Sequence, residues 1–237
     1  MPRHPSVPLT ALALICLLAA SPVRAAPPPA LTAQGEWMAH FYQHPQPDQL
    51  PQWLREVAAA GGLDQKPSRF PVMIFTAEVA KRFPEKIADW CRALGNLSSS
   101  QRASIAWSFK QAGKLDPRCS EGLTTDDLSK LEAAKPYSPL SKQPTTPDDL
   151  DQLWAVFMAT GNERAVDLVI EVLAVPVPDR STPGSVSTLL LNAAAKWSLR
   201  ANARQHQAVR NILERRLRSS QGKQQDELAA ILATPKD

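Results

Sequence analysis

Two histidines with helical spacing are the first residues whose chemistry could bind a metal. His40 and His44 lie four residues apart, so one face of a helix could present both to a single ion. Helical metalloprotease motifs place a glutamate directly after the first histidine, and here Phe41 occupies that position. Pro45 follows the second histidine and favours the end of a helix there. We therefore predict no metal site and interpret the pair as partly exposed histidines beside aromatic residues.

Cysteine chemistry has two candidates outside the N-terminal segment, Cys91 and Cys119. They are too far apart for a local thiol redox motif, and the sequence places no base beside either thiol. In an oxidising compartment such a pair favours a disulfide. Cys91 also falls on an apolar helical stripe, so a buried free thiol is the alternative. We predict the disulfide.

Carboxylates could serve an acid–base mechanism, but none stands out in the sequence. Asp148, Asp149 and Asp151 form an acidic group at a predicted helix start, where capping and the helix dipole account for them. Glu121 is followed by Gly122, not by the small hydroxyl residue expected beside the catalytic glutamate of a helical wall-cleaving glycosidase. The sequence also contains no phosphate-binding glycine loop and no nucleophile elbow. We predict no catalytic residue and no cofactor.

Charge is distributed unevenly and is the feature most suggestive of binding. From Asp126 to Glu171 the net charge is −5, whereas from Lys196 to Arg218 seven basic residues face Glu214 alone, a net of +6. The basic stretch could attract an acidic partner, although the two regions could equally attract each other across the fold. Its candidate partner-binding residues are Lys196, Arg200, Arg204, Arg210, Arg215, Arg216 and Arg218.

The N-terminus predicts where these residues act. A basic head with Arg3, an apolar run over Leu9–Ala20 and small residues ending at Ala25 are typical of a secretory signal peptide. The run is shorter than the roughly 20 residues that a membrane-spanning helix needs. Cleavage after Ala25 leaves 212 of the 237 residues, and loss of Arg3 and Arg24 lowers the net charge from +4 to +2. We expect a periplasmic or secreted protein without a transmembrane segment after signal removal.

Apolar residues recur with helical spacing along the rest of the chain, and no stretch alternates with the period of a strand. The stripes favour eight to ten helices, with Trp53, Trp90, Trp154 and Trp197 at core positions. We predict an all-α protein of antiparallel helical hairpins, which could stack into a short α-solenoid. The predicted segments are a signal peptide (1–25), an extended Pro-rich leader (26–35), an N-terminal helical part (36–135), a Pro-rich linker (136–147) and a C-terminal helical part (148–237).

One predicted hairpin resembles a known repeat. Trp154 and Phe157 on its first helix and Ala165 early on its second resemble a tetratricopeptide repeat, over about one repeat of the chain. The stretches Phe41–Pro45 and Trp197–His206 resemble a family of uncharacterised secreted bacterial helical proteins. This resemblance implies the helical fold and the compartment, and it implies no activity.

Concave helical stacks bind partners more readily than they perform chemistry, so the first hypothesis is a non-catalytic module for protein–protein interaction or scaffolding at the cell envelope. The partner would be another envelope protein, and nucleic acid is not expected in this compartment. The alternative is an envelope-acting hydrolase with an unrecognised helical active site, which requires a cleft containing a carboxyl of raised pKa.

Overall fold

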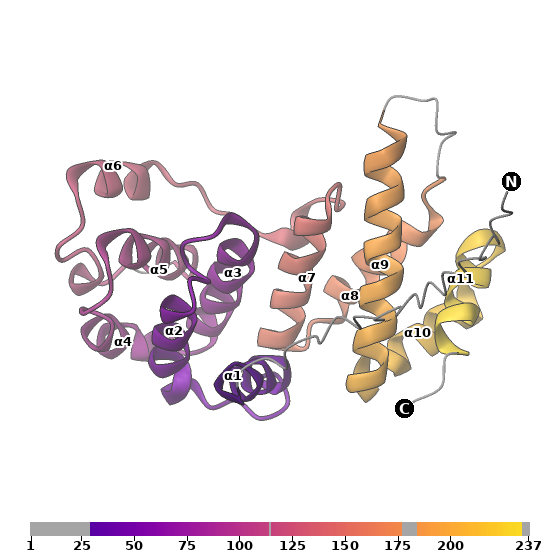
Figure 1. The fold of residues 1–237 in the computed structure, drawn as a ribbon, viewed down its shortest axis with the longest axis horizontal. Coiled ribbons are helices and arrows are strands. Elements are labelled where there is room, and N and C mark those ends of the chain that lie inside the picture. Colours follow the sequence, from indigo (N-terminus) through magenta and orange to yellow (C-terminus); the bar gives the residue numbers. More distant parts are fainter. Residues whose placement is uncertain (1–28, 114, 177–183, 234–237) are drawn as a thin grey trace, which may run out of the picture.

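The computed structural model describes residues 29–113, 115–176 and 184–233, and these contain helices and no β-strand (Figure 1). The predicted all-α fold is confirmed. The signal peptide and its cleavage site lie outside the described residues. The α-helices are α1 (Pro29–His40), α2 (Leu50–Ala59), α3 (Lys66–Arg82), α4 (Ile87–Ala93), α5 (Ser99–Gln111), α6 (Thr125–Ala133), α7 (Pro147–Thr160), α8 (Glu163–Glu171), α9 (Ser185–Gln205), α10 (Gln207–Ser219) and α11 (Gly222–Leu232).

Helix α3 is the centre of the N-terminal part, because it packs against α5 on one side and against α7 on the other. Its residues from Val72 to Ala77 are all buried, which explains why no single apolar stripe marks it in the sequence. Figure 1 shows α7 between α2–α6 and the C-terminal helices α8–α11. One hydrophobic cluster extends through both parts of the chain.

The Pro-rich segment 136–147 is packed and does not span a gap between two cores. Pro139 and Pro144 are buried, and the Tyr137 hydroxyl donates a hydrogen bond to Oε1 of Gln152 on α7 (2.7 Å). The prolines preset an extended path without unsatisfied amide groups, so this segment can lie against α7. The predicted boundary is thus a change in direction of the chain within one packed body.

Local sequence signals set the bounds of the α7–α8 hairpin. The Thr146 side chain accepts a hydrogen bond from the Asp149 amide, and Pro147 occupies the first helical turn. Gly161 ends α7 in the left-handed conformation (φ 71°), and Asn162 caps α8 by accepting from the Arg164 amide. The predicted antiparallel pair is therefore present, whereas a regular solenoid repeat stays a prediction.

Helix α1 begins earlier than the sequence indicated. The expected start was near Glu36, after an extended leader, but the helix begins at Pro29. Proline has no amide hydrogen, and an amide at this position has no helical acceptor, so a proline can begin a helix without losing a hydrogen bond. The leader prediction was wrong from Pro29 onward.

The predicted disulfide is also present. Cys91 on α4 and Cys119 in the short turn Pro117–Cys119 are bonded, with their Cα atoms 4.9 Å apart. The bond fixes this turn against α4 and closes one end of the N-terminal part.

Candidate partner-binding groove

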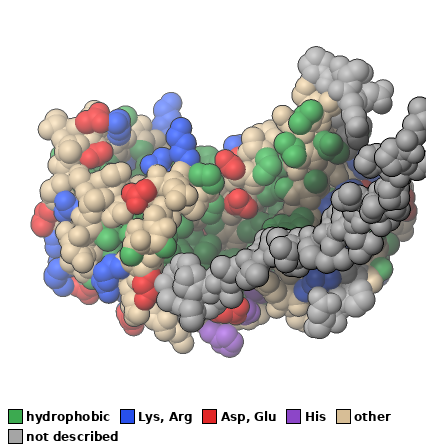
Figure 2. Space-filling view, in the orientation of Figure 1, with side chains coloured by type: hydrophobic (Ala, Val, Ile, Leu, Met, Phe, Trp, Pro, Cys, Tyr) green, Lys and Arg blue, Asp and Glu red, His purple; other side chains and the backbone are tan. Residues whose placement is uncertain are grey.

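An apolar groove of about 390 Å³ lies where α1, α3 and α7 meet. Figure 2 shows hydrophobic side chains gathered in the central hollow of the molecule, where these helices lie. The walls come from three helices that are far apart in the sequence, so no short motif reveals the groove. Its lining residues are Gly35, Met38 and Ala39 of α1, Pro67, Ser68, Pro71 and Val72 of α3, and Asp151, Trp154, Ala155 and Met158 of α7.

The first turns of α3 shape one wall through two prolines. Pro67 and Pro71 are four residues apart, so Pro71 stands where a helical residue would donate its amide hydrogen to the Pro67 carbonyl. Proline has no such hydrogen, and the carbonyl loses that donor. This wall therefore presents two apolar proline rings to the groove.

Asp151 is the one charged residue among those that line the groove. Burial raises the pKa of its carboxyl, and the negative charge of nearby Asp148 raises it further. Among the residues that the structure describes, no basic side chain pairs with Asp151. The residue is exposed at the groove, so its unpaired carboxylate is accessible and is a recognition element for a cation.

Asp149, two residues earlier on α7, is a carboxylate whose hydrogen-bonding capacity is filled by its neighbours. Burial acts to raise its pKa, but hydrogen bonds from Lys142, Thr145 and Thr146 outweigh burial and hold the pKa at about 2. Asp149 therefore serves as structural support for the start of α7, whereas Asp151 on the same helix is left without such partners.

Trp154 supplies a second unsatisfied group in the groove wall. Its side chain is buried against Phe157 at a ring-centroid distance of 6.0 Å, as its predicted core position requires. Its indole Nε1 is buried, and it has no hydrogen-bond acceptor within the described part of the chain. Buried donors of this kind usually have a partner, so the free protein leaves a polar group unsatisfied at the groove.

Helix α9 adds an exposed apolar face on the same side of the molecule. Val186, Leu189, Leu190 and Trp197 share one face of this helix by their spacing, and the Trp197 side chain is 72% exposed. Figure 2 shows hydrophobic side chains over α9 to the right of the central hollow. The expectation that Trp197 lies in the core was wrong, because the opposite face of α9, with Leu191 and Leu199, is the one that packs.

The structure places the predicted basic stretch on α9 and α10, where much of its charge is balanced within the chain. Arg215 and Arg216 lie beside acids of α8, and Arg210 pairs with Glu214 along α10. Arg200 and Arg218 form no ion pair with any described residue. The pairs are Lys196–Glu227, Arg210–Glu214, Arg215–Glu163, Arg216–Asp167 and Arg216–Glu171.

Only one histidine of the predicted pair, His40, has a histidine neighbour in the structure, and that neighbour is His206. The ring of His40 lies 5.0 Å from that of His206, which is fully buried at the junction of α9 and α10, while His44 is exposed. The Tyr42 hydroxyl lies 3.4 Å from Nδ1 of His206. Burial lowers the pKa of His206 to about 4, with the nearby His40 as a second cause. In the described ranges no three His, Cys, Asp or Glu side chains are grouped to hold a metal.

Comparison with protein-family models, with curated proteins and with solved structures finds no match to this chain. The resemblance in the sequence therefore stays an expectation. None of the helices in the described ranges combines the length and the apolar character that crossing a membrane requires.

Proposed function

We propose that the chain is a non-catalytic helical module, acting in the periplasm or outside the cell, that binds a segment of another envelope protein in the α1–α3–α7 groove. The observation that carries the proposal is the unpaired Asp151 carboxylate among apolar walls. The side chain of Asp151 is exposed, so a cationic group can reach the carboxylate, and the surrounding apolar walls desolvate it enough to favour pairing.

The chemistry of the groove defines the segment that it would take. Apolar side chains of the partner would cover Met38, Val72 and Met158, and a lysine or arginine would pair with Asp151. A groove of about 390 Å³ holds a few side chains and not a whole domain surface. The proposed ligand is therefore a short peptide segment with apolar residues around one basic residue.

The exposed face of α9 extends the proposed contact beyond the groove. Large exposed tryptophans are common anchors in protein interfaces, and Trp197 has that exposure. Arg200 lies one turn further along the same helix, so an acidic group of the partner could bind there. In this proposal Arg200 keeps a binding role, whereas Arg215 and Arg216 hold α10 against α8.

Selection from a random peptide library on the immobilised protein tests the proposal. We expect enriched peptides to carry lysine or arginine flanked by apolar residues. One enriched peptide, fluorescently labelled, should bind at least tenfold more weakly to Asp151→Lys, since the substitution removes one charge pair and adds a repulsion. Asp226→Lys is the matched control, because it makes the same charge change at an exposed position of α11.

Enriched peptides without a basic preference would contradict the proposed site. Equal weakening by Asp226→Lys would do the same, because it would mean that only the overall charge matters. Retention of full affinity by Asp151→Lys would place the binding surface elsewhere on the protein.

Export is the second part of the proposal and rests on the basic head, apolar run and small-residue site before Ala26. Expression of the full chain in a bacterial host and N-terminal sequencing of the periplasmic fraction tests it. We expect Ala26 as the first residue. A full-length chain retained in the cytoplasm would contradict the proposed location.

An envelope-acting hydrolase is a second candidate, favoured by one observation. The raised pKa of Asp151 keeps its carboxyl protonated to a higher pH than usual, as a general acid requires. The test is release of soluble fragments from purified cell-wall material by the wild type and by Asp151→Asn. Release that the substitution abolishes would favour the hydrolase over the binding module.

A further inference from the structure

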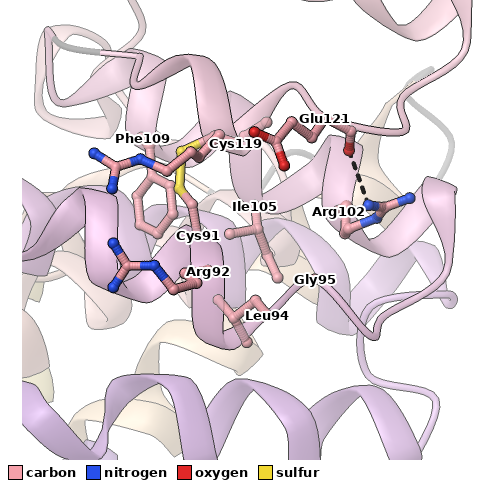
Figure 3. Close-up of a pocket in the computed structure, with 11 residues that line it drawn as sticks. Cys91, Arg92, Leu94, Gly95, Arg102, Ile105, Phe109, Cys119 and Glu121 are labelled. Carbon is pink, nitrogen blue, oxygen red and sulfur yellow. Dashed lines mark hydrogen bonds between the residues drawn. A yellow bond between two sulfur atoms is a disulfide. The ribbon is translucent and has the colours of Figure 1, made fainter.

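A second pocket, of about 260 Å³, lies beside the disulfide and shares no lining residue with the groove. It is formed by α4, α5 and the segment from Arg118 to Glu121 (Figure 3). Apolar walls come from Leu94, Ile105 and Phe109 together with the Cys91–Cys119 bond. The charged residues that line the pocket are Arg92, Arg102, Arg118 and Glu121.

The three arginines differ in how their charge is balanced. Nη1 of Arg92 donates to Asp89 (2.9 Å), and Arg118 binds both carboxylate oxygens of Asp116, at 2.8 and 3.0 Å. Arg102 donates only to backbone carbonyls, those of Glu121 (2.8 Å) and Gly122 (2.9 Å). Carbonyls accept hydrogen bonds without cancelling the positive charge, so Arg102 is the arginine whose charge has no acid paired with it in the described structure.

The fold holds the Arg102 guanidinium in a fixed position. Gly122 adopts a left-handed conformation (φ 67°), and a Cβ atom there would lie 2.6 Å from Nη2 of Arg102. The left-handed conformation favours glycine here, and a larger residue would also have to displace the guanidinium. Nε of Arg102 is buried and has no acceptor among the described residues. The cation is thus placed before any ligand arrives, which reduces the entropy lost on binding.

We propose that this pocket binds a small organic anion with an apolar body, such as an aromatic or branched carboxylate. Its charged group would pair with Arg102, and its carbon skeleton would lie against Ile105 and Phe109. The volume lies below the 300–1,000 Å³ typical of drug-sized ligands, so the ligand is small.

Glu121 sets a limit on the charge of that anion. Figure 3 shows its carboxylate pointing toward the space between Cys119 and Arg102. A second negative group on the ligand would be repelled there, so a monoanion fits better than a multiply charged one. Replacing Glu121 by glutamine should therefore tighten the binding of any anion in the pocket, and it alters an exposed residue.

Titration of the purified, oxidised protein with three small molecules tests the inference. Binding is monitored by nitrogen–proton NMR spectra that resolve the Arg102 Nε–H signal. The probes are benzoate, benzyl alcohol as its neutral analogue, and inorganic phosphate as a charge without an apolar body. Arg55→Gln is the matched control for Arg102→Gln, because Arg55 also donates to a backbone carbonyl, that of Ala93 (3.1 Å), and does not line the pocket.

We expect benzoate to shift the Arg102 signal with saturation and to bind more tightly than either other probe. Arg102→Gln should weaken benzoate by about tenfold, which corresponds to one charge-assisted hydrogen bond, and Glu121→Gln should tighten it by about two- to fivefold. Arg55→Gln should leave the affinity unchanged. Arg102→Lys keeps the charge and loses the planar fork, so an intermediate affinity is expected and serves as the test where the glutamine variant does not fold.

Several results would overturn the proposal. The first is the absence of saturation by benzoate at concentrations up to about 20 mM, where a site with one charge-assisted contact should be occupied. The second is equal binding of benzyl alcohol or phosphate, which would remove the need for charge or for an apolar body. The third is an equal loss of affinity in Arg55→Gln, or weaker binding in Glu121→Gln.

Discussion

In the contact between α8 and α10, basic side chains meet acids of the same chain: Arg216 lies 2.9 Å from Asp167, and Arg215 pairs with Glu163. In the groove, the Asp151 carboxylate lies against apolar walls with no basic side chain beside it in the described structure. The first region has many charges and uses them to hold two helices together. The second has one lining charge and leaves it for a partner, so the density of charge in the sequence is a poor guide to a binding site.

The largest expected effect separates Trp154 of the groove from Trp197 on the exposed face of α9. Trp154→Ala should lower the free energy of unfolding by about 3–5 kcal/mol, because it removes a buried aromatic side chain from the core. Trp197→Ala should change it by less than about 0.5 kcal/mol, since that side chain is 72% exposed. Urea unfolding of both variants measures the difference. A similar loss of stability in both would show that the α9 face is covered.

Sequence patterns predicted the helices and the α7–α8 hairpin because their signals are local. Thr146, Gly161 and Asn162 act within a few residues of their own position, where they cap or end these two helices. The orientation of α9 was not predictable in this way. It has apolar residues on two faces, and packing against η5 (Val172–Ala174), α10 and α11 decides that Leu199 is buried and Trp197 exposed.

The candidate site was hidden for a related reason. At the start of α7 capping and the helix dipole explain an aspartate equally well. What distinguishes the two is their surroundings: Asp149 accepts hydrogen bonds from Lys142 and Thr145 in the segment before α7, whereas Asp151 lines the groove with residues of α1 and α3. For the basic stretch the error was the opposite one: the sequence suggested charges available to a partner, and the structure pairs several of them within the chain. The acids that pair with Arg215 and Arg216 lie on α8, far away in sequence, and local charge counts give no sign of that pairing.

His206, at the junction of α9 and α10, packs against His40 of α1 and Phe157 of α7, and a fall in pH should weaken this contact. The unfolded chain binds a proton at His206 below about pH 6.5, whereas the buried native side chain has a pKa of about 4. Native stability should therefore fall as the pH drops through this window, by a total on the order of 3 kcal/mol. The charged and titratable groups near His206 are His40, Tyr42 and Glu36.

Urea unfolding of the wild type and His206→Gln at pH 7 and pH 4 isolates this contribution from that of other groups. The variant should lose less stability between the two pH values than the wild type does. Parallel losses would show that His206 is not desolvated enough to resist protonation.

A smaller effect is expected from reversing a charge in the paired region. Arg216→Glu removes ion pairs with Asp167 and Glu171 and places three acids together. Because these side chains are partly exposed, we expect a loss of about 1 kcal/mol, and the loss should shrink at high salt. Arg218→Glu is the control on the same helix, and it should stay within about 0.5 kcal/mol of the wild type. Neither variant should alter the affinity for a groove-binding peptide, which a fluorescence titration can measure.

The smallest change in stability, and the most informative, is expected from Asp151→Asn. The substitution removes an unpaired charge from an apolar groove, so stability should stay within about 0.5 kcal/mol of the wild type or rise slightly. Binding of a basic peptide should nevertheless weaken by about tenfold, because the partner loses its counter-charge. Asp149→Asn, on the same helix, should show the reverse, with lower stability from the lost interactions of Lys142 and Thr146 and nearly unchanged binding. If both aspartates affected stability alone, the groove would be a part of the core with an imperfectly buried acid, and its difference from the α8–α10 contact would carry no functional meaning.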